Sequence, residues 1–242
     1  MQRHRIALFT IPCECVSNSD SLRCVHCVVT AGPAFEPIDE VRRITNHSTG
    51  RLGCALADSL VRGGHRVTLL LSDTALHRPR SAAIEIVRFS TSADLKERLR
   101  ENAQSEIGGV FHAAAVADFR VAGVRPAGPL RLSPRIEKER KLPTRTEGYW
   151  LRLVPAPKLI GSLRRWFPSA LLVGWKFEVE GQAADALSEG RSQLVRNKTD
   201  VCVVNGPAYG EGFGVVTRRE MRHAPNPTRL FRELLGLLNT RT

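Results

Sequence analysis

Short apolar runs alternate with amphipathic segments along most of the chain. The apolar runs are rich in Val, Leu and Phe, a pattern typical of strands buried on both faces of a sheet. The amphipathic segments repeat their apolar residues at helical spacing, as Leu52, Leu56 and Leu60 do. We therefore expect strands at 24–30, 65–71, 84–89, 109–115, 149–154, 171–175, 201–205 and 214–217, and helices at 51–63, 95–102, 157–166, 183–196 and 227–238.

This alternation predicts an α/β fold with a doubly wound, mostly parallel, Rossmann-like sheet that carries helices on both faces. Ligands of such sheets bind beyond the carboxyl ends of the strands. The segments that fall at those ends, and are therefore candidate site segments, are 32–53, 113–118, 175–178 and Asn205. Thr91 and Asp94 resemble a capping box at the start of the helix at 95–102.

The connection between the first strand and the first helix is the most unusual part of the chain. It is about twenty residues long, whereas a structural connection of this kind needs about two to six. At its end Ser48, Thr49, Gly50 and Arg51 offer hydroxyls, backbone N–H groups and a cation to phosphate oxygens at a helix N-terminus. The alternative is that Ser48 or Thr49 only caps the helix.

Two well-known phosphate-binding motifs are missing. A Walker A sequence is absent, and Gly32, Gly50 and Gly53 are too far apart to form G-x-G-x-x-G. Asp118 is a lone carboxylate after a strand, either a turn residue or a ligand. The segment 119–150 is rich in Pro, Arg and Lys, and we expect a flap or a protruding insertion there. Within it, Lys138 stands in a charge run that would ordinarily be solvated.

The net charge and the distribution of apolar residues indicate which kinds of partner to expect. The formal charge of +12 favours anionic ligands, but the basic residues look spread along the 242 residues, so a nucleic-acid partner is not expected. Small polyanions such as nucleoside triphosphates explain part of the excess positive charge equally well. No apolar run is long enough for a membrane span, and 1–15 makes a poor signal peptide, so we expect a cytoplasmic protein without a membrane partner.

Four cysteines near the N-terminus form C-x-C and C-x-x-C pairs. A zinc site is conceivable, but Cys24 and Cys27 would lie on opposite faces of the first strand, so no metal site is expected. The other pair, Cys13 and Cys15, falls in 1–23, which we expect to be an N-terminal extension of a single domain at 24–242.

Two motifs closely resemble those of the phosphopantothenoylcysteine synthetase family. The first is Gly32-Pro with Glu36-Pro-Ile-Asp-Glu-Val-Arg-Arg-Ile-Thr-Asn-His-Ser-Thr-Gly-Arg-Leu-Gly53, and the second is Ala113-Ala-Ala-Val-Ala-Asp-Phe-Arg120. Weaker resemblance runs through about 24–240. It implies a ligase of coenzyme A biosynthesis that joins 4′-phosphopantothenate to L-cysteine through an acyl-nucleotide, using CTP or ATP with Mg²⁺. It further implies a homodimer and, because so little precedes the first strand, a free-standing synthetase without the decarboxylase domain.

The resemblance also implies roles for individual residues. Asn46 matches the asparagine that contacts the acyl-nucleotide, and Lys138 matches a flap lysine that reaches the triphosphate, so both are expected to be catalytic. Arg42 and Ala115 join Asn46 on the phosphopantothenate side. The residues expected at the nucleotide, besides Lys138, are Gly32, Ser48, Thr49, Gly50, Arg51, Ala113, Ala114, Asp118, Pro157, Ile160 and Trp175.

Some positions depart from the family pattern, and two other functions stay open. Trp175 replaces a usual Phe, Lys176 after it is unusual, and Gln193 and Asn197 align with usual lysines. One alternative is an NAD(P)-dependent oxidoreductase, against which the missing glycine fingerprint and the absence of a Tyr-x-x-x-Lys pair speak. The other is a non-catalytic relative that binds nucleotides or nucleic acid.

Overall fold

The computed structural model describes residues 24–103, 105–127, 141–144 and 147–240. Lys138, Cys13, Cys15 and the expected extension at 1–23 lie outside the described residues. Among the described residues, no helix is long and apolar enough to cross a membrane.

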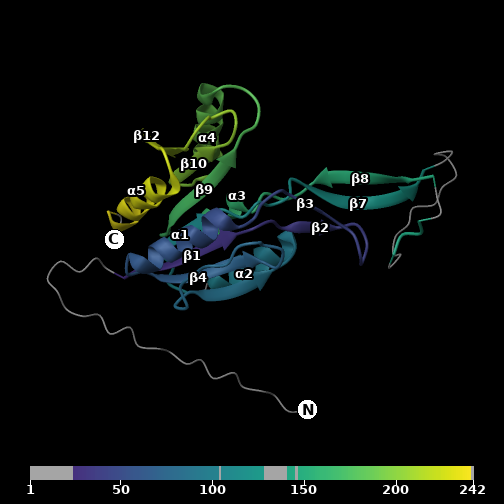
Figure 1. Cartoon of the computed structure of the whole chain (residues 1–242), viewed down its shortest axis with the longest axis horizontal. Helices are drawn as coiled ribbons and strands as arrows, with labels where there is room; N and C mark the ends of the chain where they lie inside the picture. The colour runs from purple at the N-terminus through teal and green to yellow at the C-terminus, as the bar shows by residue number, and fades with distance from the viewer. Residues whose placement is uncertain (1–23, 104, 128–140, 145–146, 241–242) are drawn as a thin grey trace, which may run out of the picture.

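An eight-stranded sheet forms the centre of the molecule (Figure 1). Its order is β12-β11-β10-β9-β6-β1-β4-β5. The parallel strands are β1 (His26–Ala31), β4 (Arg66–Ser72), β5 (Glu85–Phe89), β6 (Gly109–His112), β9 (Leu171–Phe177) and β10 (Val201–Asn205). Antiparallel β11 (Phe213–Thr217) and β12 (Met221–Ala224) complete one edge. The predicted mostly parallel, Rossmann-like sheet is confirmed.

Helices cover both faces of this sheet. On one face, α1 (Arg51–Arg62) and α5 (Pro227–Asn239) pack on alternate strand residues such as Val29 and Leu69. On the other face lie α2 (Ser92–Asn102), α3 (Ile160–Trp166) and α4 (Ala183–Asn197). This alternation explains why the strands read as continuous apolar runs, since each side chain is buried by one helical layer or the other.

Two hairpins outside the main sheet were not predicted as such. Three-residue strands β2 (Phe35–Pro37) and β3 (Arg43–Thr45) pair within the long connection before α1. Longer strands β7 (Phe119–Pro126) and β8 (Tyr149–Pro155) form an antiparallel ribbon that projects from the sheet (Figure 1). The expectation of a protruding insertion is therefore confirmed. No strand was expected in its first half, and the presence of β7 shows that this was wrong.

Several expected boundaries need correction. The strand expected at 109–115 ends at His112, and the helix expected from 157 begins at Ile160. The short edge strand β12 was missed. Thr91 does cap α2 by accepting the Asp94 N–H at 3.1 Å, but the Asp94 carboxylate accepts the N–H of Ser90 rather than that of Thr91.

The first strand begins at His26, so Cys24 precedes it and is exposed, whereas Cys27 is buried in the sheet. In the described part of the chain, no three His, Cys, Asp or Glu side chains gather as a metal site would require.

Candidate functional site

The candidate site lies where the strand order reverses. From β1 the chain adds β4 and β5 on one side, then returns to place β6 on the other side, so the crevice between β1 and β6 is the topological switch point. The loops after these strands are joined there. Ala34 N–H donates to the Ala115 carbonyl and Ala115 N–H to the Gly32 carbonyl, each at 3.0 Å. Backbone hydrogen bonds therefore join the two family-like motifs.

A buried polar pair lies directly beneath these hydrogen bonds. Thr30 Oγ1 accepts the Ala114 N–H at 3.0 Å and lies 3.0 Å from His112 Nδ1. Both side chains are buried. The Thr30 hydroxyl oxygen therefore hydrogen-bonds both the Ala114 backbone and the His112 ring. The pair thus fixes the peptide of Ala114 relative to the first strand.

The burial of His112 predicts an acid-sensitive stability. Desolvation lowers the pKa of His112 to about 4, below its usual 6.5. Between these values the unfolded chain binds a proton that the folded protein does not, so the free energy of unfolding falls as pH decreases from 6.5 to 4. The loss attributable to His112 is at most about 3 kcal/mol.

Denaturant unfolding of the wild type and of His112→Asn at several pH values tests this. The pKa values of His26 and His65 are also lowered, mainly by burial, and they remain in both proteins. The variant is expected to lose less stability on acidification than the wild type. Equal losses would exclude His112 as a source of the pH dependence.

The glycines that looked too far apart in sequence meet in space. Seventeen residues separate Gly32 from Gly50, yet a Cβ on Gly50 would lie 3.4 Å from the Cα of Gly32. A Cβ on Gly53 would lie 2.6 Å from the Cβ of Ala31, so this glycine lets α1 approach β1 closely. The β2–β3 hairpin lies between Gly32 and Gly50 in the chain, so these glycines come together only in the folded structure.

The N-terminus of α1 is open to a ligand. Its N-cap is Gly50, with a left-handed φ of 77°, and no side chain caps the helix. Thr49 Oγ1 only accepts the Arg51 N–H, at 3.4 Å, and Ser48 N–H donates to the Asn46 carbonyl. Neither side chain caps the helix, so the alternative that Ser48 or Thr49 only caps it does not hold. The first backbone N–H groups of α1 have no partner within the helix and lie at the positive end of its dipole.

The loop after β4 closes one side of this glycine cluster. Cβ atoms on Gly32 and Gly50 would lie 3.0 and 3.1 Å from the Cβ of Ala75, and the N–H groups of Leu76 and His77 donate to the Thr49 carbonyl. These contacts hold the loop after β4 against the start of α1.

The side chain of Asn46 links the first family-like motif, to which it belongs, to the second. Its Nδ2 donates to the Val116 carbonyl at 3.2 Å, and its side chain is otherwise exposed. Thr45, the residue before it, donates its hydroxyl to the Ala34 carbonyl at 3.1 Å. These two hydrogen bonds join the end of β3 to the loop after β1 and to the loop after β6. They bring the Asn46 amide to the loop that contains Ala113, Ala114 and Ala115.

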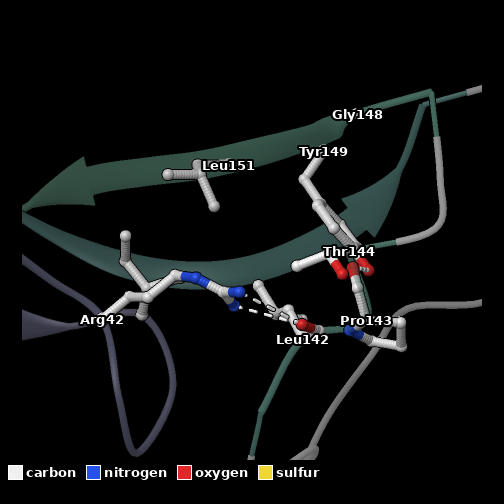
Figure 2. A pocket seen from close by; sticks show the side chains of 8 residues that line it. Arg42, Leu142, Pro143, Thr144, Gly148, Tyr149 and Leu151 are labelled. Atoms are coloured by element: carbon white, nitrogen blue, oxygen red, sulfur yellow. Dashed lines mark hydrogen bonds between the residues drawn. The ribbon is translucent and has the colours of Figure 1, made fainter.

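Arg42 lies at the other end of β3 and faces the ribbon. Its guanidinium contacts the Asp39 carboxylate at 2.6 Å and donates to the Leu142 carbonyl at 3.2 and 3.3 Å (Figure 2). The Asp39 carboxylate accepts the Leu142 N–H at 3.0 Å, and this bond, followed by those from the Val41 and Arg42 backbones, lowers the pKa of Asp39 to about 2. The backbone N–H and carbonyl of Leu142 are thus both hydrogen-bonded to side chains about 100 residues earlier in the sequence.

A cavity of about 350 Å³ opens beside Arg42. Its walls are mostly apolar and include Ile38 and Leu142, with Tyr149 and Leu151 contributed by the ribbon (Figure 2). The structure therefore places Arg42 against the end of the ribbon where β8 begins, away from the main sheet. A chain-like ligand with one charged end fits such a mixture of apolar wall and cation.

The remaining expected nucleotide residues lie at the ends of β6 and β9. Asp118 forms an exposed ion pair with Lys158, and the Ala156 N–H donates to the Asp118 carbonyl at 2.8 Å. Pro157 is exposed in the same loop. The side chain of Ile160 packs on Gly174, where a Cβ would lie 2.6 Å from Ile160 Cδ1.

Trp175 is half-buried on the face of the sheet that α1 covers. Its indole Nε1 is buried and has no hydrogen-bond partner among the described residues. Gln193, which aligns with a family lysine, lies on the opposite face and its Nε2 contacts Cys202 Sγ at 3.3 Å.

Some residues that build the site were not singled out from sequence. Thr30 and His112 are polar residues inside apolar strand runs, which was a usable indication of buried hydrogen bonds. Asp39 and Lys158 gave no such indication, because their partners Leu142 and Asp118 are distant in sequence.

Solved structures share this architecture. The DNA/pantothenate metabolism flavoprotein from Streptococcus pneumoniae superposes with a TM-score of 0.81 at 23% identity, over 90% of this chain and all of that chain. A Cab2 mutant in complex with phosphopantothenate-cysteine superposes with a TM-score of 0.69 at 16% identity, over 90% of this chain and 87% of that one. At these identities the likeness concerns the fold alone.

Curated relatives are similar in sequence. The coenzyme A biosynthesis bifunctional protein CoaBC of Bacillus subtilis is 33% identical over 194 residues, which cover 79% of this chain and 43% of the relative. A cysteine/cysteine sulfinic acid decarboxylase from an unknown prokaryotic organism is 34% identical over 193 residues, covering 79% of this chain and 48% of the relative. The chain thus spans about half the length of the curated relatives it matches.

A family model described as the DNA/pantothenate metabolism flavoprotein C-terminal domain matches residues 22–224. The match includes both sequence motifs, the switch point and the ribbon. The chain therefore belongs to this family, the phosphopantothenoylcysteine synthetase family that its two motifs resemble.

Proposed function

We propose that this protein is a ligase of coenzyme A biosynthesis that joins 4′-phosphopantothenate to L-cysteine. The observation that carries the proposal is the meeting of Asn46, the Ala113–Ala115 backbone and the open N-terminus of α1 at one switch point. The relative in Bacillus subtilis is named for coenzyme A biosynthesis, which supports the same pathway.

The proposed reaction has two steps. The substrate carboxylate attacks the α-phosphate of CTP or ATP, which forms an acyl-nucleotide and releases pyrophosphate. The cysteine amine then attacks the acyl carbon, the nucleoside monophosphate leaves, and an amide bond remains. Both nucleophiles come from the substrates, so the protein has to position them and stabilise developing negative charge.

The site residues divide between these tasks. We assign the phosphates to the backbone N–H groups of Gly50 and Arg51 at the N-terminus of α1, where the helix dipole favours anions. The Asn46 amide is assigned to the acyl oxygen, and Arg42 with its cavity to phosphopantothenate. Mg²⁺ bound to the triphosphate would supply further charge neutralisation, as would Lys138 of the flap.

The activity test uses purified protein with 4′-phosphopantothenate, L-cysteine, Mg²⁺ and either CTP or ATP. Pyrophosphate and a thiol-bearing amide should form together, and the nucleotide that gives the higher kcat/KM identifies the co-substrate. If neither nucleotide yields pyrophosphate and amide, the ligase proposal fails.

A homodimer completes the proposal. One face of the ribbon carries Phe119 and Leu153, which are 54% and 46% exposed, and such neighbouring apolar side chains are typical of a protein contact. We assign this face to a second copy of the chain. Sedimentation equilibrium of the wild type and of Leu153→Glu measures the expected shift from dimer toward monomer.

A further inference from the structure

The pairing of β7 with β8 sorts the ribbon into two chemically different faces. Directly opposed residues in an antiparallel pair share a face, and successive residues alternate. Trp150 pairs with Arg125, Arg152 with Gly123, and Val154 with Arg120. These residues form one face, which we call the arginine face, and the opposite face consists of apolar residues: Phe119, Val121, Val124, Pro126, Tyr149, Leu151, Leu153 and Pro155.

The arginine face is open to solvent. Arg120, Arg125 and Arg152 are exposed, and Trp150 is 59% exposed. Neither strand contains Asp or Glu. Within the ranges that the structure describes, none of the three arginines forms an ion pair. The unusual feature of this face is the exposed indole of Trp150, since Trp is highly buried on average.

The sequence segment that contains the ribbon is strongly basic. Residues 119–155 contain nine Lys and Arg and three Glu, a net charge of +6 out of the +12 of the chain. The basic residues are therefore less evenly spread along the sequence than they first looked. Among the described residues of this segment, Arg120, Arg125 and Arg152 lie on the arginine face, where positive charge favours anionic partners.

The arginine face points away from the proposed active site. Tyr149 and Leu151 of the apolar face line the cavity beside Arg42 and Leu142 (Figure 2). Because Trp150 and Arg152 alternate with them along β8, they project from the other side of the ribbon. The substrates of the ligase thus do not account for these arginines, nor does the apolar face assigned to a second copy.

We propose that the arginine face binds single-stranded nucleic acid. Guanidinium groups pair with backbone phosphates, and an exposed indole between them offers a platform on which an unpaired base stacks. An extended strand of seven or eight residues spans about 25 Å, enough for a few nucleotides. Stacking on Trp150 requires a base that is not already paired, which favours a single strand over a duplex.

The test is fluorescence anisotropy with a labelled oligothymidylate of about 20 nucleotides, longer than the ~4–16 nucleotides that one such surface contacts. The wild type should bind, with an affinity that falls steeply between about 50 and 200 mM salt. Trp150→Ala should weaken binding about tenfold. Arg125→Gln with Arg152→Gln should also weaken binding and make the salt slope shallower by about 1.4, or 0.7 for each arginine.

Arg218→Gln is the matched control, because it removes an equally exposed arginine from the turn between β11 and β12. It should leave both affinity and salt slope near those of the wild type. Thermal unfolding verifies that each variant is folded. None of these measurements depends on ligase activity, so the two proposals fail or succeed separately.

Three results would overturn the proposal. The first is no salt-dependent binding by the wild type, and the second is an equal loss of affinity in Arg218→Gln and in the arginine-face variants. The third is tighter binding to a DNA duplex of the same length, or to vesicles rich in phosphatidylserine, than to the single strand. Either preference would assign the surface to a different class of partner.

Discussion

Asn46→Asp is expected to reduce the rate of amide formation by about 100-fold or more, the cost of losing one donor to an oxyanion. The Asn46 amide donates to the Val116 carbonyl at 3.2 Å, so its orientation is fixed without a substrate. A carboxylate of the same shape has no N–H to donate. It also places a negative charge beside the acyl oxygen, where negative charge develops as the cysteine amine attacks.

Rapid-quench experiments with separate measurement of pyrophosphate and amide locate the effect. Pyrophosphate release should be affected less than amide formation, because negative charge develops on the acyl oxygen only when the cysteine amine attacks the acyl carbon. Unchanged turnover would remove Asn46 from the mechanism.

Asn102→Asp provides the matched control for this substitution. Asn102 also donates its side-chain amide to a backbone carbonyl, that of Arg98, at 2.9 Å. It lies at the end of α2, away from the switch point. The same chemical change there should alter turnover little. A comparable loss in both variants would mean that the effect is structural and not specific to the site.

Gly53→Ala is expected to destabilise the protein and to weaken nucleotide binding together. The added Cβ would lie 2.6 Å from Ala31 Cβ and 3.2 Å from the Thr30 carbonyl oxygen, and strand backbone cannot yield as a flexible side chain does. Helix α1 has to move away from β1, at a cost of about 1–3 kcal/mol. The same movement displaces the N-terminus of α1 from the phosphates.

Gly236→Ala is the control for helix propensity. Gly236 lies in α5, and a Cβ there meets nothing within 4 Å. Alanine should therefore stabilise this helix by about 0.5–1 kcal/mol. Urea unfolding and nucleotide titration of the two variants give the comparison. If Gly53→Ala is as stable as Gly236→Ala, then α1 does not depend on close contact with β1.

The sequence predicted the parallel sheet well because its strands are buried on both faces. Val28 and Val29, for instance, are both fully buried, each under a different helical layer, so the apolar run has no interruption. The ribbon strand β7 was missed for the opposite reason. Its alternation of apolar residues with arginine is broken at the register shift between Val121 and Gly123, which disrupts the period of two.

The candidate site was predicted in part. The family-like motifs identified the two loops that meet at the switch point, and Asn46 does lie between them. The roles assigned to the individual site residues stay predictions. The contacts of Arg42 with Leu142 and of Asp118 with Lys158 join segments about 100 and 40 residues apart, and no local pattern encodes such pairs.

What the sequence by itself determined is the layered α/β fold and the family, because burial period and motif spacing are local properties. The tertiary structure decided how separated residues combine. It brought Gly32, Gly50 and Gly53 together across an inserted hairpin, and it placed the arginines of the ribbon on one face. Both results depend on backbone pairing and close approach between distant segments, and these are set only when the chain folds.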